Sequence, residues 1–148
     1  MKKKVLIVCA NYYEGITFSL RADAEKILNS SKIKCDHLNV PGIFEIPVSI
    51  VKNIKKYDGF VALGCVIKGE TPHFDFISKS TFDAIMNLSI QYKKPIGNGI
   101  ITALNLNQAK IRSGDSGKFS SFKDKKKGKG IESAIAVVDV LKNETKRS

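Results

Sequence analysis

A short segment, Lys68-Gly69-Glu70-Thr71-Pro72-His73, combines residue types that bind anions and move protons. It follows an apolar run and precedes a segment with helical periodicity. Thr71 followed by Pro72 is typical of an N-cap with proline at the first helical position. The backbone amides around Gly69 would then point into the crevice at the positive end of a helix, where anions bind favourably. The segment therefore predicts a phosphate or carboxylate site.

The same segment supplies a candidate base. His73 falls at about the second position of the expected helix, where the helix dipole disfavours a positively charged ring. We expect the imidazole to stay neutral and to accept a proton near neutral pH. A capping or surface histidine is an equally good interpretation of this single signal. The other histidine, His37, lies beside Asp36 in a strand-like run and is interpreted as structural.

Apolar periodicity predicts four strands that alternate with helices. We expect strands at residues 5–10, 33–40, 60–67 and 96–102, and helices at residues 16–28, 46–54, 74–92, 106–112 and 131–141. This order is typical of a parallel sheet with helices on both faces, in which ligands bind beyond the carboxyl ends of the strands. The expected site therefore lies among Asn11–Gly15, Val40–Glu45, Lys68–His73 and Thr102–Leu104.

Length and composition favour one intracellular domain. The 148 residues match the size of a single domain. No apolar run approaches the ~18 residues of a membrane span, and the run at Val5–Ala10 is too short for a signal peptide. We therefore expect a cytoplasmic protein without a membrane partner. The odd cysteine count without a C-x-x-C spacing argues against disulfides and a metal site, and predicts reduced thiols at Cys9, Cys35 and Cys65.

The net charge of +11 suggests a nucleic-acid partner, but its distribution argues against one. Lys2–Lys4 contribute three lysines, and Lys118–Gly130 holds six lysines and one aspartate. Most of the excess charge therefore lies in a terminal tail and one loop, without an ordered basic face. We interpret the loop as a solvated segment that attracts anionic substrates, and we expect no nucleic-acid partner.

Four motifs, in the same order, resemble those of one enzyme family. They are Val40–Pro47 (VPGIFEIP), Leu63–Asp75 (LGCVIKGETPHFD), Pro95–Gln108 (PIGNGIITALNLNQ) and Lys129–Glu132 (KGIE). Together they resemble the signature segments of the 6,7-dimethyl-8-ribityllumazine synthases of riboflavin biosynthesis. The resemblance covers nearly the whole chain outside the lysine loop.

The resemblance implies a fold and a reaction. The fold would be a three-layer αβα, flavodoxin-like sandwich with a four-stranded parallel sheet. The reaction would be a cofactor-free condensation of 5-amino-6-ribitylaminouracil with 3,4-dihydroxy-2-butanone 4-phosphate, and the products would be the lumazine, phosphate and water. The resemblance also implies pentamers or larger assemblies, with each site shared between neighbouring subunits.

Matched position by position, the motifs imply roles for individual residues. Tyr12 would stack on the pyrimidine ring, and the ribityl chain would lie along Ile43, Phe44 and Glu45. The backbone of three strand residues would bind the edge of the pyrimidine; these residues are Cys65, Val66 and Ile67. The Cys65 thiol would then have no nucleophilic role.

The remaining matched residues would handle the phosphate and the proton. The amides of Glu70 and Thr71 would bind the phosphate, and His73 would shuttle protons. Arg112 would reach the phosphate from the neighbouring subunit, and Lys129 would belong to the same neighbour's contribution. The simpler interpretation of Arg112 is a cation at the C-terminal end of a short helix.

The chain departs from the family pattern at three places. Asn98 replaces an aromatic residue that lines the pocket in many members, so that a stacking contact would be either lost or replaced by a hydrogen bond. Ile43 replaces a smaller residue and would narrow the ribityl channel. The segment from Ser113 to Gly128 is longer and more basic than in compact members.

Three alternatives remain beside the enzyme. A receiver domain needs clustered acidic residues at the end of its first strand, whereas this strand ends Cys9-Ala10-Asn11-Tyr12. A nucleic-acid-binding protein would use the Lys118–Lys129 loop, with affinity that falls steeply with salt. A homologue that binds flavin or lumazine without turnover differs from the enzyme only in an assay.

Overall fold

The protein is built around one parallel sheet. The computed structural model describes residues 2–69, 73–114 and 128–143. The strands are β1 (Lys4–Ala10), β2 (Lys34–Val40), β3 (Gly59–Ile67) and β4 (Ile96–Ala103), and their order in the sheet is β2-β1-β3-β4. All neighbouring strands are parallel. The four strands and their parallel pairing confirm the prediction from the sequence.

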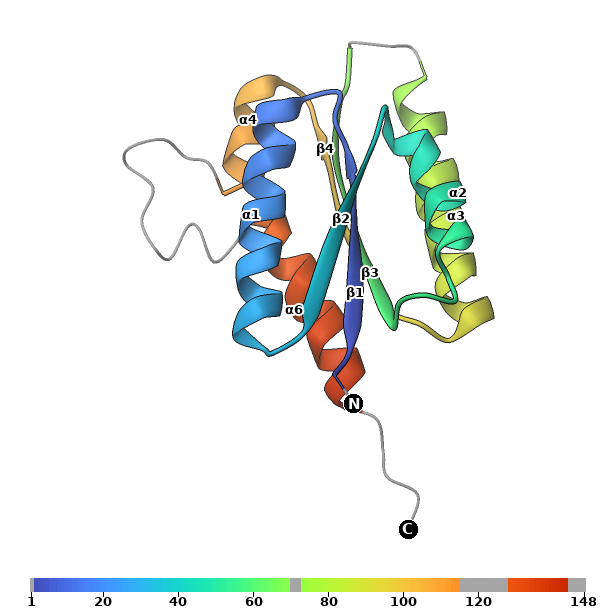
Figure 1. Ribbon diagram of the computed structural model, residues 1–148. Coiled ribbons are helices and arrows are strands. Elements are labelled where there is room, and N and C mark those ends of the chain that lie inside the picture. The colour runs from blue at the N-terminus through green and yellow to red at the C-terminus, as the bar shows by residue number, and fades with distance from the viewer. Residues whose placement is uncertain (1, 70–72, 115–127, 144–148) are drawn as a thin grey trace.

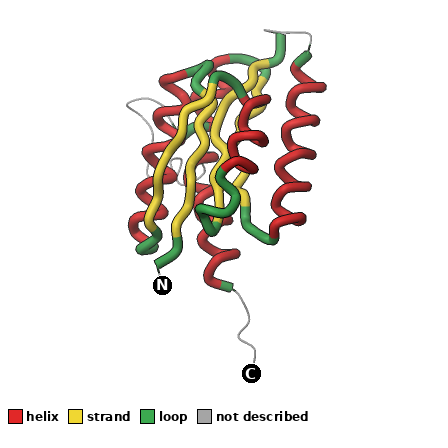
Figure 2. Tube along the Cα trace, turned by 45° about the vertical axis from the view of Figure 1, so that its right-hand side comes forward, coloured by secondary structure: helices red, strands yellow, loops and turns green. Residues whose placement is uncertain are grey.

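Helices cover both faces of the sheet. On one face lie α1 (Glu14–Ser30), α4 (Leu106–Arg112) and α6 (Lys129–Lys142); on the other lie the short 3-10 helix η1 (Ile43–Glu45), α2 (Ile46–Lys52) and α3 (Phe74–Tyr92) (Figure 1). The turned view shows the strands between the two helical layers (Figure 2). The expected three-layer αβα, flavodoxin-like sandwich is therefore confirmed.

Each face of the sheet carries its own apolar core. Side chains of β1 alternate between them: Val5, Ile7 and Cys9 face α1 and α6, whereas Leu6 and Val8 face α2 and α3. The central strands β1 and β3 are buried almost throughout, which explains their continuous apolar sequences. The edge strand β2 is mostly exposed.

The start of α3 differs from the prediction. The amide of Ile77 donates to the carbonyl of His73 at 2.9 Å, and the helix proper begins at Phe74. His73 is therefore the N-cap residue, and its predicted placement at the second helical position is wrong. The predicted cap and first helical residue, Thr71 and Pro72, lie outside the described residues.

Several further features bear on the expectations from the sequence. The three cysteines are free thiols, as expected. No helix in the described part of the chain is long and apolar enough to cross a membrane. In the same residues no three His, Cys, Asp or Glu side chains gather as a metal site requires. Most of the lysine loop, residues 115–127, lies outside the described ranges.

Two glycines let α6 approach its neighbours at backbone distance. A Cβ atom at Gly97 in β4 would lie 2.2 Å from the carbonyl oxygen of Ser133 in α6. A Cβ atom at Gly130 would lie 2.4 Å from the carbonyl oxygen of Leu20 in α1. These contacts fix the first turn of α6, which begins at Lys129, against β4 and α1.

The substitution Gly97→Ala should destabilise the fold, because neither backbone can yield without moving α6. We expect a loss of about 2–3 kcal/mol in the free energy of unfolding, as for other overpacked cores, measured by urea denaturation. Gly15→Ala is the matched control, since its Cβ would meet nothing within 4 Å. Equal stability of the two variants would contradict the close packing of α6.

Candidate functional site

A crevice lies beyond the carboxyl ends of β1 and β3, next to η1. Its volume is about 290 Å³, and it includes six of the residues predicted from the sequence. Its lining consists of Ala10, Tyr12, Tyr13, Gly42, Ile43, Phe44, Cys65, Val66, Ile67 and Ile77. Four chain segments that are far apart in sequence meet here, because parallel strands end at the same edge of the sheet.

The β1 end of the crevice presents an exposed aromatic ring. Tyr12 is 73% exposed and contacts Tyr13 edge to face, with 4.9 Å between the ring centroids. The backbone beneath it is held by two bonds: Thr17 Oγ1 donates to the Ala10 carbonyl at 2.8 Å, and the Asn11 amide donates to the Val40 carbonyl at 2.9 Å. A solvent-facing ring on a fixed backbone is suited to stacking on a planar ligand.

Ile43 forms the floor of the crevice. It is buried, and its Cγ2 would lie only 2.9 Å from a Cβ atom at position 64, which is occupied by Gly64. The branched side chain thus fills the space that the glycine leaves above β3. The larger residue at position 43 is accommodated by the core beneath it as well as by the crevice.

The Glu45 side chain serves the local backbone. Its Oε1 accepts a hydrogen bond from the Gly42 amide at 2.9 Å, which caps the start of η1. Glu45 is not among the residues that line the crevice. The capping bond does not test the predicted role of Glu45 in binding a ribityl chain, and that role stays a prediction.

Cys65 lines the crevice as a protonated thiol. Burial raises its pKa to about 11, so that the sulfur is not a thiolate near neutral pH. The thiolate is the nucleophilic form of cysteine. A protonated, buried thiol is a poor nucleophile, and the predicted role of the Cys65 backbone toward a pyrimidine stays a prediction.

The segment between β3 and α3 is described at its two ends. The Lys68 amide donates to the Ala103 carbonyl at 2.8 Å, and Gly69 adopts a φ of 93°, a left-handed conformation that favours glycine. His73 is exposed at the start of α3, one turn before the crevice residue Ile77. Glu70 and Thr71, the predicted phosphate-binding residues, lie outside the described ranges.

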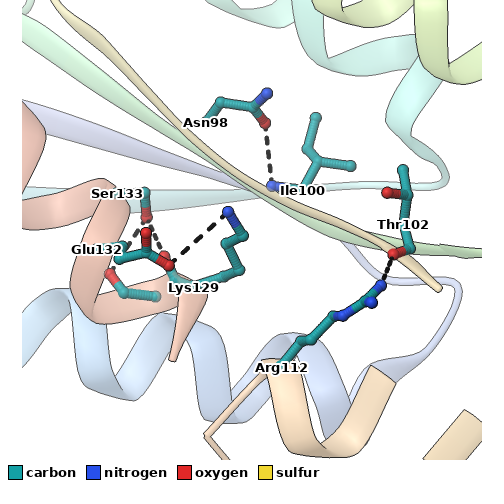
Figure 3. Close-up of polar contacts among 8 residues, drawn as sticks. Asn98, Ile100, Thr102, Arg112, Lys129, Glu132 and Ser133 are labelled. Atoms are coloured by element: carbon teal, nitrogen blue, oxygen red, sulfur yellow. Dashed lines mark hydrogen bonds and ion pairs between the residues drawn. The ribbon is translucent and has the colours of Figure 1, made fainter. Parts of the chain in front are cut away.

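A second hollow, of about 360 Å³, lies along the outer edge of β4. It is lined by Phe82, Asn98, Ile100, Ile101, Thr102, Arg112 and Lys129. Figure 3 shows how its polar groups are held: Arg112 donates to the Thr102 carbonyl, and the Lys129 ammonium lies 3.8 Å from a carboxylate oxygen of Glu132. Two cations thus converge on an edge strand, an arrangement that attracts an anion.

The predicted site residues that line these hollows therefore fall into two separate groups, whereas Glu45 and His73 line neither hollow. The crevice holds Tyr12, Ile43, Phe44 and the β3 residues, whereas Asn98, Arg112 and Lys129 line the hollow at β4. The two lining sets share no residue. Within one chain, the predicted phosphate-binding cations are not part of the crevice that the ring-binding residues form.

Sequence reasoning missed several lining residues. Tyr13 and Ile77 complete the crevice, and Phe82 and Thr102 complete the hollow at β4. The apolar stripe of α3 was visible in the sequence, but periodicity does not indicate which turns of a helix extend beyond the sheet. Tyr13 and Thr102 were included only as members of the strand-end segments Asn11–Gly15 and Thr102–Leu104.

A larger hollow, of about 530 Å³, lies between α1 and the edge strand β2. Its cation, Arg21, already donates to His37 Nε2 at 2.7 Å and lies 3.8 Å from Glu25. These contacts tie α1 to β2, and they agree with the structural interpretation of His37. We therefore do not place the site in this hollow.

Known proteins resemble the chain over almost its full length. The family described as 6,7-dimethyl-8-ribityllumazine synthase matches residues 2–144. The chain is 39% identical over 147 residues to the 6,7-dimethyl-8-ribityllumazine synthase of Bartonella tribocorum, covering 96% of this chain and 93% of that protein. The enzymes of the same name from Bartonella henselae and Agrobacterium fabrum are 45% and 40% identical over 116 and 126 residues, covering 76% and 79% of this chain and 75% and 85% of theirs.

The matches, the parallel sheet and the crevice at its strand ends agree with one another. The chain belongs to the 6,7-dimethyl-8-ribityllumazine synthase family.

Proposed function

We propose that this chain catalyses its family's condensation of 5-amino-6-ribitylaminouracil with 3,4-dihydroxy-2-butanone 4-phosphate, and that the crevice beside Tyr12 is where the uracil binds. The lumazine, phosphate and water are the products. The observation that carries this proposal is the crevice itself, because six of the seven residues that match the family's pyrimidine- and ribityl-binding positions, all but Glu45, line one cavity of about 290 Å³.

The reaction requires that the two substrates are positioned against each other and that protons are transferred between them. The amine of the uracil attacks the ketone carbon, and one water leaves as the imine forms. A proton then leaves the hydroxyl-bearing carbon beside the imine as phosphate leaves the next carbon, and the resulting enol becomes a new ketone. The second amine attacks this ketone, and a second water leaves as the ring closes. Tyr12 stacks on the pyrimidine, and Ile43 and Phe44 guide the ribityl chain. His73, exposed beside the crevice, relays the protons that move between the amine, the carbonyl oxygen and the leaving groups.

We also propose that a neighbouring subunit completes each site. Its β4 hollow would face the crevice and bring Arg112 and Lys129 to the phosphate, beside the amides of Glu70 and Thr71. Support comes from the separation of the two lining sets in one chain. Further support comes from exposed large apolar side chains that an assembly would cover, as in pentamers: Phe44, Val48, Phe76, Met86 and Ile90. The free thiols of the chain suit a cytoplasmic location.

Removal of the Arg112 guanidinium or of the His73 imidazole should lower turnover. Arg112→Ala should weaken phosphate binding by ten- to hundred-fold, roughly the value of hydrogen bonds to a charged group, whereas His73→Ala should lower kcat and barely change phosphate binding. Lumazine formation, followed by its fluorescence, and phosphate titration calorimetry measure the two effects. Lys110→Ala, an exposed lysine on the same helix as Arg112, is the control. Full activity in both variants would remove the site assignment.

A shared site predicts complementation between inactive subunits. When His73→Ala and Arg112→Ala chains are unfolded together and reassembled, some interfaces combine an intact crevice with an intact β4 hollow, and activity should return. His73→Ala mixed with Tyr12→Ala should stay inactive, because both defects lie in the crevice half. Sites contained within one chain would give no recovery in either mixture.

Cys65→Ala should retain most of the turnover, within about three-fold. The protonated thiol supplies no nucleophile, and the proposed contacts of this residue use its backbone. The check is the pH profile of kcat between pH 6 and pH 9, which should keep its shape in the variant. Loss of turnover in a folded variant would assign the sulfur a chemical role.

A further inference from the structure

The hollow between α1 and β2 lies at the carboxyl ends of two neighbouring strands, β1 and β2. Its volume of about 530 Å³ falls within the range of about 300–1,000 Å³ that small-molecule sites have. No described residue lines both this hollow and the crevice. Its lining consists of Cys9, Asn11, Glu14, Gly15, Thr17, Phe18, Arg21 and Asn39. Open parallel sheets bind ligands beyond this end of their strands, so the position is suited to a second site.

Three polar side chains of this hollow have no partner among the residues that the structure describes. No hydrogen bond or ion pair within these residues engages the carboxamides of Asn11 and Asn39 or the carboxylate of Glu14. Each carboxamide offers two N–H donors and an oxygen acceptor, and the carboxylate offers acceptors. Donors and acceptors therefore stand side by side in the hollow.

The charges around the hollow favour an uncharged ligand. Arg21 Nη1 donates to His37 Nε2 at 2.7 Å, and Arg21 Nε lies 3.8 Å from Glu25 Oε1. An anion would compete with Glu25 for the guanidinium and would meet the carboxylate of Glu14. A cation would meet the guanidinium itself. In the described lining the charges of Arg21 and Glu14 cancel, so a neutral molecule has the lowest electrostatic cost.

The walls of the hollow add apolar surface to these polar groups. Phe18 is 62% exposed, and its ring centroid lies 5.3 Å from Arg21 Cζ. The buried Cys9 lines the hollow from β1, and burial raises the pKa of its thiol to about 11, so that the sulfur is uncharged near neutral pH. An exposed aromatic ring packs against C–H groups of a ligand, while the neighbouring amides serve its polar groups.

We propose that this hollow is a second binding site, and that it takes an uncharged sugar or polyol. Hydroxyl groups both donate and accept, so they can pair with Glu14 and with both ends of the Asn11 and Asn39 carboxamides. The carbon chain of the ligand packs against the ring of Phe18. The inference goes beyond the proposed condensation and does not depend on it.

A fluorophore placed in the hollow tests the proposal. The sequence contains no tryptophan, so Phe18→Trp places a single indole on the wall of the hollow and keeps it aromatic. Ribitol is the probe, and it should shift the emission of this chain along a saturating curve. Succinate at the same concentrations should give no saturating change. Tyr92→Trp is the control, because Tyr92 ends α3 shortly before β4 begins, at the opposite end of the sheet, and its emission should not follow ribitol.

Second substitutions in the Phe18→Trp chain identify the contacts. Asn39→Ala should weaken ribitol binding by about three- to ten-fold, the value of one hydrogen bond between neutral groups. Gly15→Leu should abolish the saturating response: a Cβ at position 15 would meet nothing within 4 Å, so the leucine has room to occupy the hollow. Asn107→Ala, which removes an exposed carboxamide on α4, should leave ribitol binding unchanged.

The other outcomes overturn the inference. Saturation by succinate instead of ribitol would mean that Arg21 binds an anion. The same ribitol curve in Tyr92→Trp would mark a general solvent effect of the polyol. Equal ribitol affinity in the Phe18→Trp chain with and without Asn39→Ala or Gly15→Leu would place ribitol outside the hollow, and no response to either probe would leave the hollow without the proposed ligand class.

Discussion

Parallel pairing of β1 with β3 is the constraint that creates the crevice. The pairing runs from Val5–Gly59 to Cys9–Leu63, and it brings the ends of both strands to one edge of the sheet. Neither strand can shift by one residue without turning its buried side chains to the wrong core, because side chains alternate between two apolar layers. Tyr12 and Cys65 therefore occupy fixed positions relative to each other, although more than fifty residues separate them in the chain.

The edge strand β4 has unpaired backbone groups that side chains must satisfy. An edge strand carries backbone groups that no neighbouring strand satisfies. Here two side chains meet two of them: Asn98 accepts from the Ile100 amide, and Arg112 donates to the Thr102 carbonyl. The same two bonds orient a neutral donor and a guanidinium outward. The two hydrogen bonds that satisfy backbone groups at the edge of β4 therefore also shape the β4 hollow.

The sequence predicts most of the fold because the central strands are apolar on both faces and the helices have clear stripes. Its errors have local causes. The Thr71-Pro72 pair suggested an earlier start for α3 than the bond from Ile77 to His73 defines, and η1 is too short to leave a periodic signal. Tyr12, Ile43 and Phe44 were predictable from topology because they follow strand ends, whereas Cys65, Val66 and Ile67 lie within β3 and were indicated only by the family resemblance. The direction of the Asn98 amide could not be predicted. It depends on which edge of β4 lacks a neighbouring strand, and apolar periodicity does not give the order of the strands in the sheet.

Placement of the cations on the far side of β4 has a consequence for catalysis. Close packing of α6 through Gly97 and Gly130 holds Lys129 at that edge, and α4 holds Arg112 there. A helix fixed by backbone contacts cannot swing its first turn across two strands to the crevice of the same chain. If these cations bind the phosphate, they must therefore act on the crevice of another copy. An isolated chain would then bind the uracil ring without the groups that hold the phosphate-bearing substrate. Activity would then require assembly for a geometric reason, since the rigidity that stabilises each subunit also prevents it from completing its own site.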